Sequence, residues 1–175
     1  MSISAHLTPE PERRLWIIFE NMRRAVESAD VKIGALTAFA AAELAFIAPS
    51  APVGPLALLI LASLSAALPL GVFALAPLSR LPAWLSFLEP AKDKTSVNDC
   101  LIAPEDVAKY TQNELTHRLD KYLGGGITAT PYYEDIVGQI VAHASAAARK
   151  QRLLRATCAA VGVGQLCLLA RLIAR

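Results

Sequence analysis

Residues 33–79 decide the fold, and they read IGALTAFAAAELAFIAPSAPVGPLALLILASLSAALPLGVFALAPLS. The 47 residues of this stretch contain one formal charge, that of Glu43. One membrane-spanning helix needs about 20 apolar residues, so the stretch has the length of two spans and a turn. Residues 49–55 contain three prolines and a glycine, which interrupt helices and mark the turn. We predict a transmembrane hairpin with helices over 31–48 and 55–77 and a kink at Pro69.

A third apolar run, residues 156–173, lies near the end of the sequence. Its 18 residues suit a short span, and the long side chain of Arg171 can reach the lipid headgroups. The same run also suits a buried helix of a soluble domain or a helix that lies in the membrane interface. We predict a third transmembrane helix here.

The basic residues are unevenly distributed. Of 17 Lys and Arg residues, five lie in 1–32, ten in 78–155 and two after 155, and the turn contains none. Segments rich in Lys and Arg stay on the cytoplasmic side of a membrane. We therefore expect residues 1–32 and 78–155 in the cytoplasm of a bacterium and the protein in its inner membrane. The net charge of +2 is too small for a protein that binds the backbone of DNA or RNA.

Helical patterns fill both predicted cytoplasmic segments. Apolar residues recur every three or four positions within 1–30, which predicts an amphipathic helix; they are Leu15, Ile18, Phe19, Met22, Val26 and Ala29. Pro104, followed by two acids, predicts the start of a helix that runs to the glycines at 124–126. No proline follows Pro131, so a last helix is expected to run from there into the third span.

These patterns together predict an all-α integral membrane protein. The expected order is an N-terminal amphipathic helix (1–30), a transmembrane hairpin (31–48 and 55–77), a cytoplasmic helical region (78–155) and a C-terminal third transmembrane helix (156–173). Small residues four positions apart predict faces where helices pack closely. These are Gly34, Ala38 and Ala42 in the first span, and Ala160 and Gly164 in the third.

Three charged residues lie at the edge of the first predicted span or inside it. Asp30 and Lys32 flank its inner end, either as ordinary boundary charges or as part of a fixed ion pair at the interface. Glu43 lies inside the span, where a carboxylate is costly and usually faces a partner, a cavity or a pathway. Only six positions separate Glu43 from Pro49, so contact with the outer headgroups is an equal alternative.

The densest basic cluster contains Arg149, Lys150, Arg152 and Arg155. One interpretation is a belt that binds lipid headgroups and sets the topology. The other is a site for an anionic ligand, since guanidinium groups bind phosphate through two hydrogen bonds. Two aromatic residues, Tyr132 and Tyr133, offer a stacking surface for a base, although their place at the start of an apolar stripe also suits a helical core.

Other kinds of chemistry find no support in the sequence. The three histidines and three cysteines make no ligand spacing for a metal. The glycines at 124–126 lack the preceding strand and the Lys-Ser/Thr ending of a phosphate-binding loop. No set of side chains can be argued to converge on a reaction. We therefore expect no enzyme, no metal and no cofactor.

Three short motifs resemble a known family. Residues 29–32 (ADVK) open the apolar hairpin, and residues 105–110 (EDVAKY) open a cytoplasmic helix. The third motif leads into the last span and consists of residues 133–139 followed by Ser145, Ala147, Lys150, Leu154 and Arg155. Over residues 28–175, this pattern resembles the transmembrane effectors of Pycsar antiphage systems.

The resemblance implies a function and a set of partners. A neighbouring pyrimidine cyclase would make cyclic CMP or cyclic UMP (cCMP or cUMP) on phage infection, and the nucleotide would bind this effector, with 78–155 as the sensing region. The effector, expected to be a homo-oligomer in the lipid bilayer, would then impair the inner membrane and cause abortive infection and cell death. No nucleotide-binding residue is transferred by the resemblance. The alternatives are a membrane effector gated by another nucleotide or by a partner protein, and a small channel or transporter subunit with Glu43 on its pathway.

Overall fold

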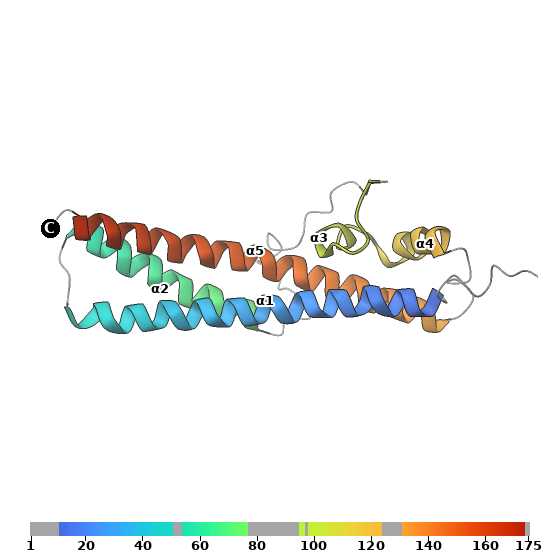
Figure 1. The fold of residues 1–175 in the computed structure, drawn as a ribbon, viewed down its shortest axis with the longest axis horizontal. Helices are drawn as coiled ribbons and strands as arrows, with labels where there is room; N and C mark the ends of the chain where they lie inside the picture. The colour runs from blue at the N-terminus through green and yellow to red at the C-terminus, as the bar shows by residue number, and fades with distance from the viewer. Residues whose placement is uncertain (1–10, 51–53, 77–94, 97, 124–130, 174–175) are drawn as a thin grey trace, which may run out of the picture. The chain divides into compact units, whose positions relative to one another are not determined.

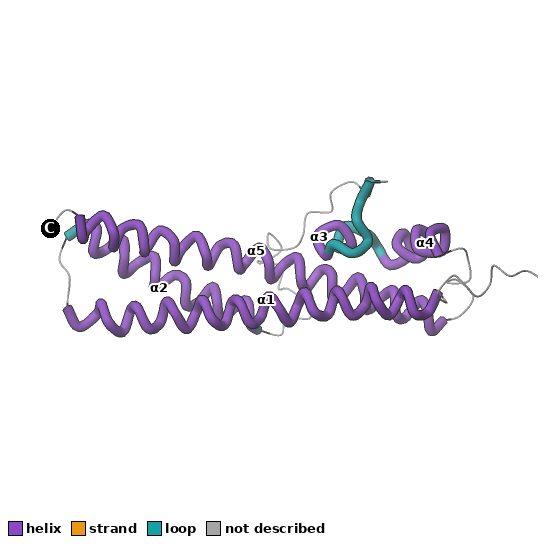
Figure 2. Tube along the Cα trace, in the orientation of Figure 1, coloured by secondary structure: helices purple, strands orange, loops and turns teal. Residues whose placement is uncertain are grey.

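The computed structural model describes residues 11–50, 54–76, 95–96, 98–123 and 131–173. Every regular element among them is helical (Figures 1 and 2). The elements are α1 (Pro11–Ile47), the short 3-10 helix η2 (Ala48–Ser50), α2 (Pro55–Leu75), α3 (Pro104–Val107), α4 (Gln112–Leu123) and α5 (Pro131–Ile173). The chain divides into two compact units. Unit 1 comprises Met1–Glu27 and Ala83–Arg149, and unit 2 comprises Ser28–Pro82 and Lys150–Arg175, so α1 and α5 each contribute residues to both.

Prolines and a glycine explain where the helices begin. Pro11, Pro55 and Pro131 each occupy the first position of a helix, where the missing N–H costs no hydrogen bond. Gly54, directly before α2, has a φ of 119°, a conformation that favours glycine. Pro69 lies inside α2, and the kink expected there stays a prediction. Of the predicted turn at 49–55, residues 51–53 lie outside the described part of the chain.

Unit 1 has a core of large apolar side chains. The buried cluster consists of Leu15, Met22, Val107, Tyr110, Leu115, Leu119, Ile136, Val137, Ile140 and Ala144. Two further members of the predicted apolar stripe, Ile18 and Phe19, are half-buried and pack against this cluster. On the exposed surface of α1, Arg23 pairs with Glu27 and Arg24 pairs with Glu20. The part of α1 in unit 1 therefore has one face in the core and charged residues in solvent.

The single helix predicted from Pro104 to residue 123 is wrong, because α3 ends at Val107 and α4 begins at Gln112. A reciprocal cap separates the two helices. Thr111 Oγ1 accepts a hydrogen bond from the Glu114 N–H (3.4 Å), and Glu114 Oε2 accepts one from the Thr111 N–H (2.9 Å). This capping box satisfies donors that a helix start leaves without partners, so it favours a new helix at this point.

Unit 2 packs its helices through apolar side chains and, at its closest contacts, through small residues. Its buried cluster is Ala40 of α1, Ile60, Leu64 and Ala67 of α2, and Val161 of α5. A β-carbon added at Gly71 would lie 1.9 Å from Thr37 Oγ1, so α1 and α2 come this close only because Gly71 has no side chain. Such close approach of backbones is typical of helices that pack inside a membrane.

The two predicted small-residue faces behave differently within the chain. On α5, Gly164 is buried and a β-carbon there would lie 3.0 Å from Ser63 Oγ of α2, while Ala160 packs against the cluster of unit 2. On α1, a β-carbon at Gly34 would meet nothing within 4 Å, and the other two members of the face, Ala38 and Ala42, are exposed. The prediction is therefore wrong for α1 within a single chain. The packed face of α1 is the one that carries Ile33 and Ala40, both of which are fully buried.

Two helices among the described residues, α2 and α5, are long and apolar enough to cross a membrane. They contain the second and the third predicted spans. The first predicted span is not among them, since the last 18 residues of α1 include Asp30, Lys32 and Glu43. The first span and the topology of the chain stay predictions.

Candidate functional site

An ion pair in unit 2 joins two residues that are 120 positions apart in the sequence. Lys150 Nζ of α5 donates a hydrogen bond to Asp30 Oδ1 of α1. The Lys150 side chain is 13% exposed and that of Asp30 is 36% exposed, so salt and water screen this pair less than one on an open surface. Asp30 is thus part of an ion pair, but its partner is Lys150 and not the neighbouring Lys32.

The arginines of the basic cluster differ in exposure. Arg149 is half-buried, whereas Arg152 and Arg155 are exposed. All three have interactions of their own. Arg149 belongs to unit 1, and the other members of the cluster belong to unit 2. The cluster therefore lies where α5 passes from one unit to the other.

The two tyrosines proposed for base stacking lie at the start of α5. Their ring centroids are 5.8 Å apart, and Tyr132 is 51% exposed. Tyr133 is half-buried and packs against the core of unit 1. Tyr132 lies 17 residues before Arg149 on the same helix, which corresponds to about 25 Å along the axis. Within unit 1, the tyrosines and Arg149 are therefore too far apart to hold one mononucleotide together.

The structure provides Glu43 with a protein partner. Gln165 Nε2 of α5 donates a hydrogen bond to Glu43 Oε1 of α1. Glu43 Oε2 is also buried and has no hydrogen-bond partner within the described part of the chain. Glu43 lies 13 residues after Asp30, or about 20 Å along α1. The two polar pairs Asp30–Lys150 and Glu43–Gln165 thus join α1 and α5 at two levels.

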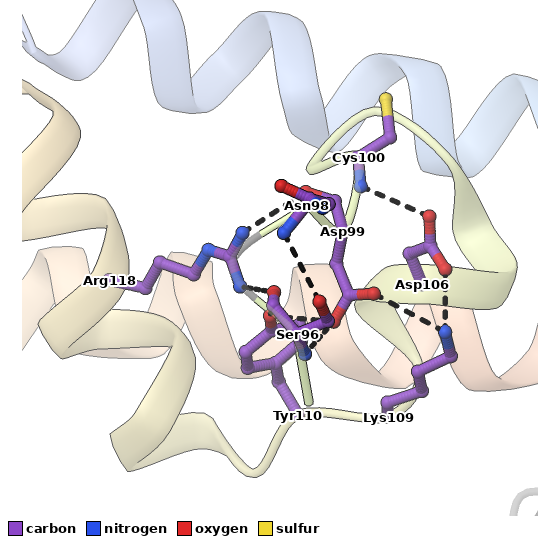
Figure 3. A network of polar contacts seen from close by, with 8 residues as sticks. All are labelled: Ser96, Asn98, Asp99, Cys100, Asp106, Lys109, Tyr110 and Arg118. Carbon is purple, nitrogen blue, oxygen red and sulfur yellow. Dashed lines mark hydrogen bonds and ion pairs between the residues drawn. The ribbon is translucent and has the colours of Figure 1, made fainter. Parts of the chain in front are cut away.

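A polar network in unit 1 was not predicted from the sequence. In Figure 3 the Lys109 ammonium lies between two carboxylates, at 2.7 Å from Asp106 Oδ1 and 3.4 Å from Asp99 Oδ1. The Tyr110 hydroxyl donates to Asp99 Oδ2 (2.9 Å), and the Ser96 N–H donates to the same oxygen (2.6 Å). These contacts attach the segment before α3 to the turn between α3 and α4.

The charges of this network shift the pKa values of three groups. The Ser96 N–H, with further help from Lys109, lowers the pKa of Asp99 below its usual value. The hydrogen bond from Lys109 lowers the pKa of Asp106, and the same bond raises the pKa of Lys109. Each shift favours the charged form, so the network is strongest when all three groups are ionised.

Arg118 of α4 completes the network from the other side. Its guanidinium donates to the carbonyl oxygens of Ser96 and Asp99, the latter at 3.1 Å, and lies 5.0 Å from the ring centroid of Tyr110. The network therefore attaches the segment before α3 to α4, and its donors and acceptors bind one another. The spacing of Asp106 and Lys109, three positions apart at a helix start, is the one sequence signal that predicts part of it.

These features define a class: a helical protein in which two of the described helices, α2 and α5, are long and apolar enough to cross a membrane. The family model described as the Pycsar effector protein domain matches residues 14–174, and the chain therefore belongs to the Pycsar effector family. No curated protein and no solved structure matches the chain. The family and the two apolar helices indicate a membrane protein of antiviral defence, and the family implies partnership with a cyclase.

Proposed function

We propose that this protein is the membrane effector of a Pycsar-type antiphage system, activated by cCMP or cUMP made by a partner cyclase during infection. The activated protein, as a homo-oligomer in the bacterial inner membrane, impairs that membrane and causes abortive infection. It acts without catalysis, and unit 1 lies in the cytoplasm. Membership of the Pycsar effector family supports this class of function.

The packing of unit 2 supports a membrane position for the second part of α1. Ala40 shares a buried cluster with residues of α2 and α5, and Thr37 lies against Gly71 of α2. A segment in such close contact with two apolar spans shares their environment. Asp30 pairs with Lys150, and one carboxylate oxygen of Glu43 accepts a hydrogen bond from Gln165; partners of this kind reduce the cost of charge in a membrane. We therefore propose that the second part of α1 crosses the membrane as the first of three spans.

The Asp30–Lys150 ion pair is the observation that supports a mechanism. A cyclic nucleotide has one phosphate charge, and Lys150 and Arg152 offer cations for it. A phosphate that binds Lys150 competes with the Asp30 carboxylate and weakens this contact between α1 and α5. A ligand shifts a conformational equilibrium only when it binds the two states differently, and this competition supplies the difference.

Ligand binding and membrane damage can be tested separately. Titration of the purified full-length protein with cCMP and with cUMP in a calorimeter is expected to show saturable binding of at least one. Cells that express the protein are expected to take up propidium iodide only when that nucleotide is supplied. A lack of binding to both nucleotides contradicts the proposal at its first step. Dye uptake without nucleotide favours a constitutive channel in its place.

Substitutions in the basic cluster test the assigned residues. Lys150→Ala and Arg152→Ala are each expected to weaken nucleotide binding about tenfold, since each removes a hydrogen bond to a charged group. Arg149→Ala tests the third residue that is predicted to bind the nucleotide. Lys121→Ala removes an exposed positive charge from α4 and serves as the matched control, with binding unchanged. Wild-type affinity in all three cluster variants would leave the cluster as a belt that sets the topology.

A further inference from the structure

An apolar groove lies between α1 and α5 in unit 2. It is lined by Lys32, Ala35, Leu36, Phe39, Leu154 and Cys158, and its volume is about 440 Å³. Phe39 is 50% exposed, and Ala35 and Cys158 are also exposed. The Lys32 ammonium is the single charged group among the lining side chains. The groove is therefore suited to an apolar chain with an anionic end.

The charged end of the groove lies at the edge of the predicted first span. Lys32 is exposed, and it has no hydrogen bond or ion pair to any residue that the structure describes. It is two residues from Asp30, whose carboxylate is taken by Lys150. From Lys32 to Phe39 the groove extends about 10 Å along the helix axis. The hydrocarbon layer of one leaflet is about 15 Å thick, so the groove runs along most of a leaflet.

We propose that this groove binds one acyl chain of an anionic phospholipid, with the headgroup phosphate at Lys32. The inference rests on the membrane position of unit 2 in the proposed function and is independent of nucleotide activation. The apolar walls from Ala35 to Phe39 and from Leu154 to Cys158 contact the chain. Lys32 contributes the charge that selects an anionic headgroup.

The charges of unit 2 favour a lipid over a second copy of the protein. Its described residues contain five basic side chains and two acids, Asp30 and Glu43. Asp30 already pairs with Lys150, and Glu43 already contacts Gln165. In a copy with the same orientation, Glu43 also lies 11 residues, or about 16 Å, further along α1 than Lys32. The described part of unit 2 in a second copy therefore has no available acid at the level of Lys32, whereas a phospholipid supplies a phosphate there.

Photo-crosslinking and native mass spectrometry test this inference on the full-length protein. The probe is a phosphatidylglycerol with a diazirine in one acyl chain, added to delipidated protein in detergent without any nucleotide. Crosslinks are expected on peptides that contain residues 35–39 and 154–158. Unlabelled phosphatidylglycerol is expected to compete for the probe, whereas phosphatidylcholine and inorganic phosphate are expected to compete weakly.

Three variants connect the crosslinks to the groove. Lys32→Gln is expected to weaken phosphatidylglycerol binding roughly fivefold, the effect of one basic residue near an anionic surface. Ala35→Trp fills the groove without changing a charge, and we expect it to remove the crosslinks. Lys121→Gln removes an exposed charge outside the groove, so wild-type binding is expected. Far-UV circular dichroism identifies a variant that fails to fold. If Ala35→Trp fails to fold, Lys32→Gln still tests the inference.

Several outcomes overturn the inference. Equal binding of phosphatidylglycerol and phosphatidylcholine, or wild-type binding by Lys32→Gln, contradicts the role of Lys32. Displacement of the probe by inorganic phosphate alone indicates an anion site without an acyl chain. Disulfides between Cys158 residues of two copies in a bilayer would place a second copy in the groove. Intact lipid crosslinks with no nucleotide response contradict the proposed function alone, whereas release of the protein from membranes by alkaline carbonate contradicts the membrane position that both require.

Discussion

Unit 1 and unit 2 hold their helices together in different ways. In unit 1, side chains as large as Met22 and Leu119 fill the core, and polar side chains around Asp99 form one connected network. In unit 2, alanines and glycines allow close contacts between helices around Ile60 and Leu64, and the polar contacts between its described helices include Asp30–Lys150 and Glu43–Gln165.

The difference is explained by the environment proposed for each unit, which is water for unit 1 and lipid for unit 2. In water, removal of large apolar side chains from solvent is the main stabilising force. In lipid this force between helices is lost, so close packing and a few polar contacts take its place. The comparison therefore predicts that each unit is sensitive to a different kind of substitution.

The largest expected effect is the loss of a large core side chain in unit 1. Leu119 is 1% exposed, and Leu119→Ala is expected to lower the free energy of unfolding by about 2–5 kcal/mol through the cavity that it leaves. Leu58 of α2 is 70% exposed, and Leu58→Ala is expected to change the free energy of unfolding by less than about 0.5 kcal/mol. Thermal unfolding in detergent, followed by circular dichroism, measures both. Equal losses would show that exposure in unit 2 does not mean contact with lipid.

The next effect concerns close helix contacts in unit 2. Gly71→Ala places a β-carbon against Thr37 Oγ1 and is expected to cost about 1–3 kcal/mol. Gly34→Ala is the matched control, because its β-carbon meets nothing within 4 Å, and we expect it to be neutral or slightly stabilising. Adding Thr37→Ala to Gly71→Ala removes the clashing hydroxyl and is expected to recover about 1 kcal/mol. Without that recovery, the assigned contact is not the source of the loss.

A smaller effect is expected at the polar pair inside unit 2. Gln165→Leu leaves the Glu43 carboxylate without its amide partner and is expected to destabilise the protein by about 1–2 kcal/mol. The double variant Glu43→Leu/Gln165→Leu replaces both partners with apolar groups and is expected to recover most of this loss. Unfolding by SDS in mixed micelles measures the cycle. A double variant that is less stable than Gln165→Leu would mean that Glu43 stabilises the protein through contacts other than its hydrogen bond with Gln165.

The smallest effect is expected from acid acting on the network of unit 1. The pKa values of Asp99 and Asp106 lie below the usual 3.8, so their contribution to stability is complete above that pH and is lost as the pH falls through the lowered values. The melting temperature of the wild-type protein is therefore expected to decrease in that acidic window. Asp99→Asn should lower the melting temperature at neutral pH and reduce its dependence on acid. Asp135→Asn, an exposed position of α5, is the control and should follow the wild type.

The sequence predicted the helices better than it predicted their contacts. The second and third predicted spans lie in helices that suit a membrane, and Pro131 begins α5 as expected. The break between α3 and α4 was missed, although Thr111 and Glu114 have the spacing of a capping box. That signal is local and was available.

Candidate site residues were found without their partners. Asp30, Glu43 and Lys150 attract notice because each charge lies at or near an apolar run, but the contacts Asp30–Lys150 and Glu43–Gln165 join residues 120 and 122 positions apart. Asp99 and Arg118 carry no such signal, since single polar residues outside a recognised motif look like ordinary surface. Their hydrogen bonds depend on how the loop before α3 meets α4.

Local chemistry in the chain was enough to specify the apolar segments, the helix starts at prolines and the membership of a family of membrane effectors. These properties depend on hydropathy, on backbone geometry and on short motifs, which act over a few neighbouring residues. Only the tertiary structure decided that Thr37 and Ala40 define the packed face of α1, that Lys150 pairs with Asp30, and that Lys32 is left at the end of an apolar groove. The physical reason is that packing between distant helices selects one face from several with similar composition, and composition alone does not distinguish them.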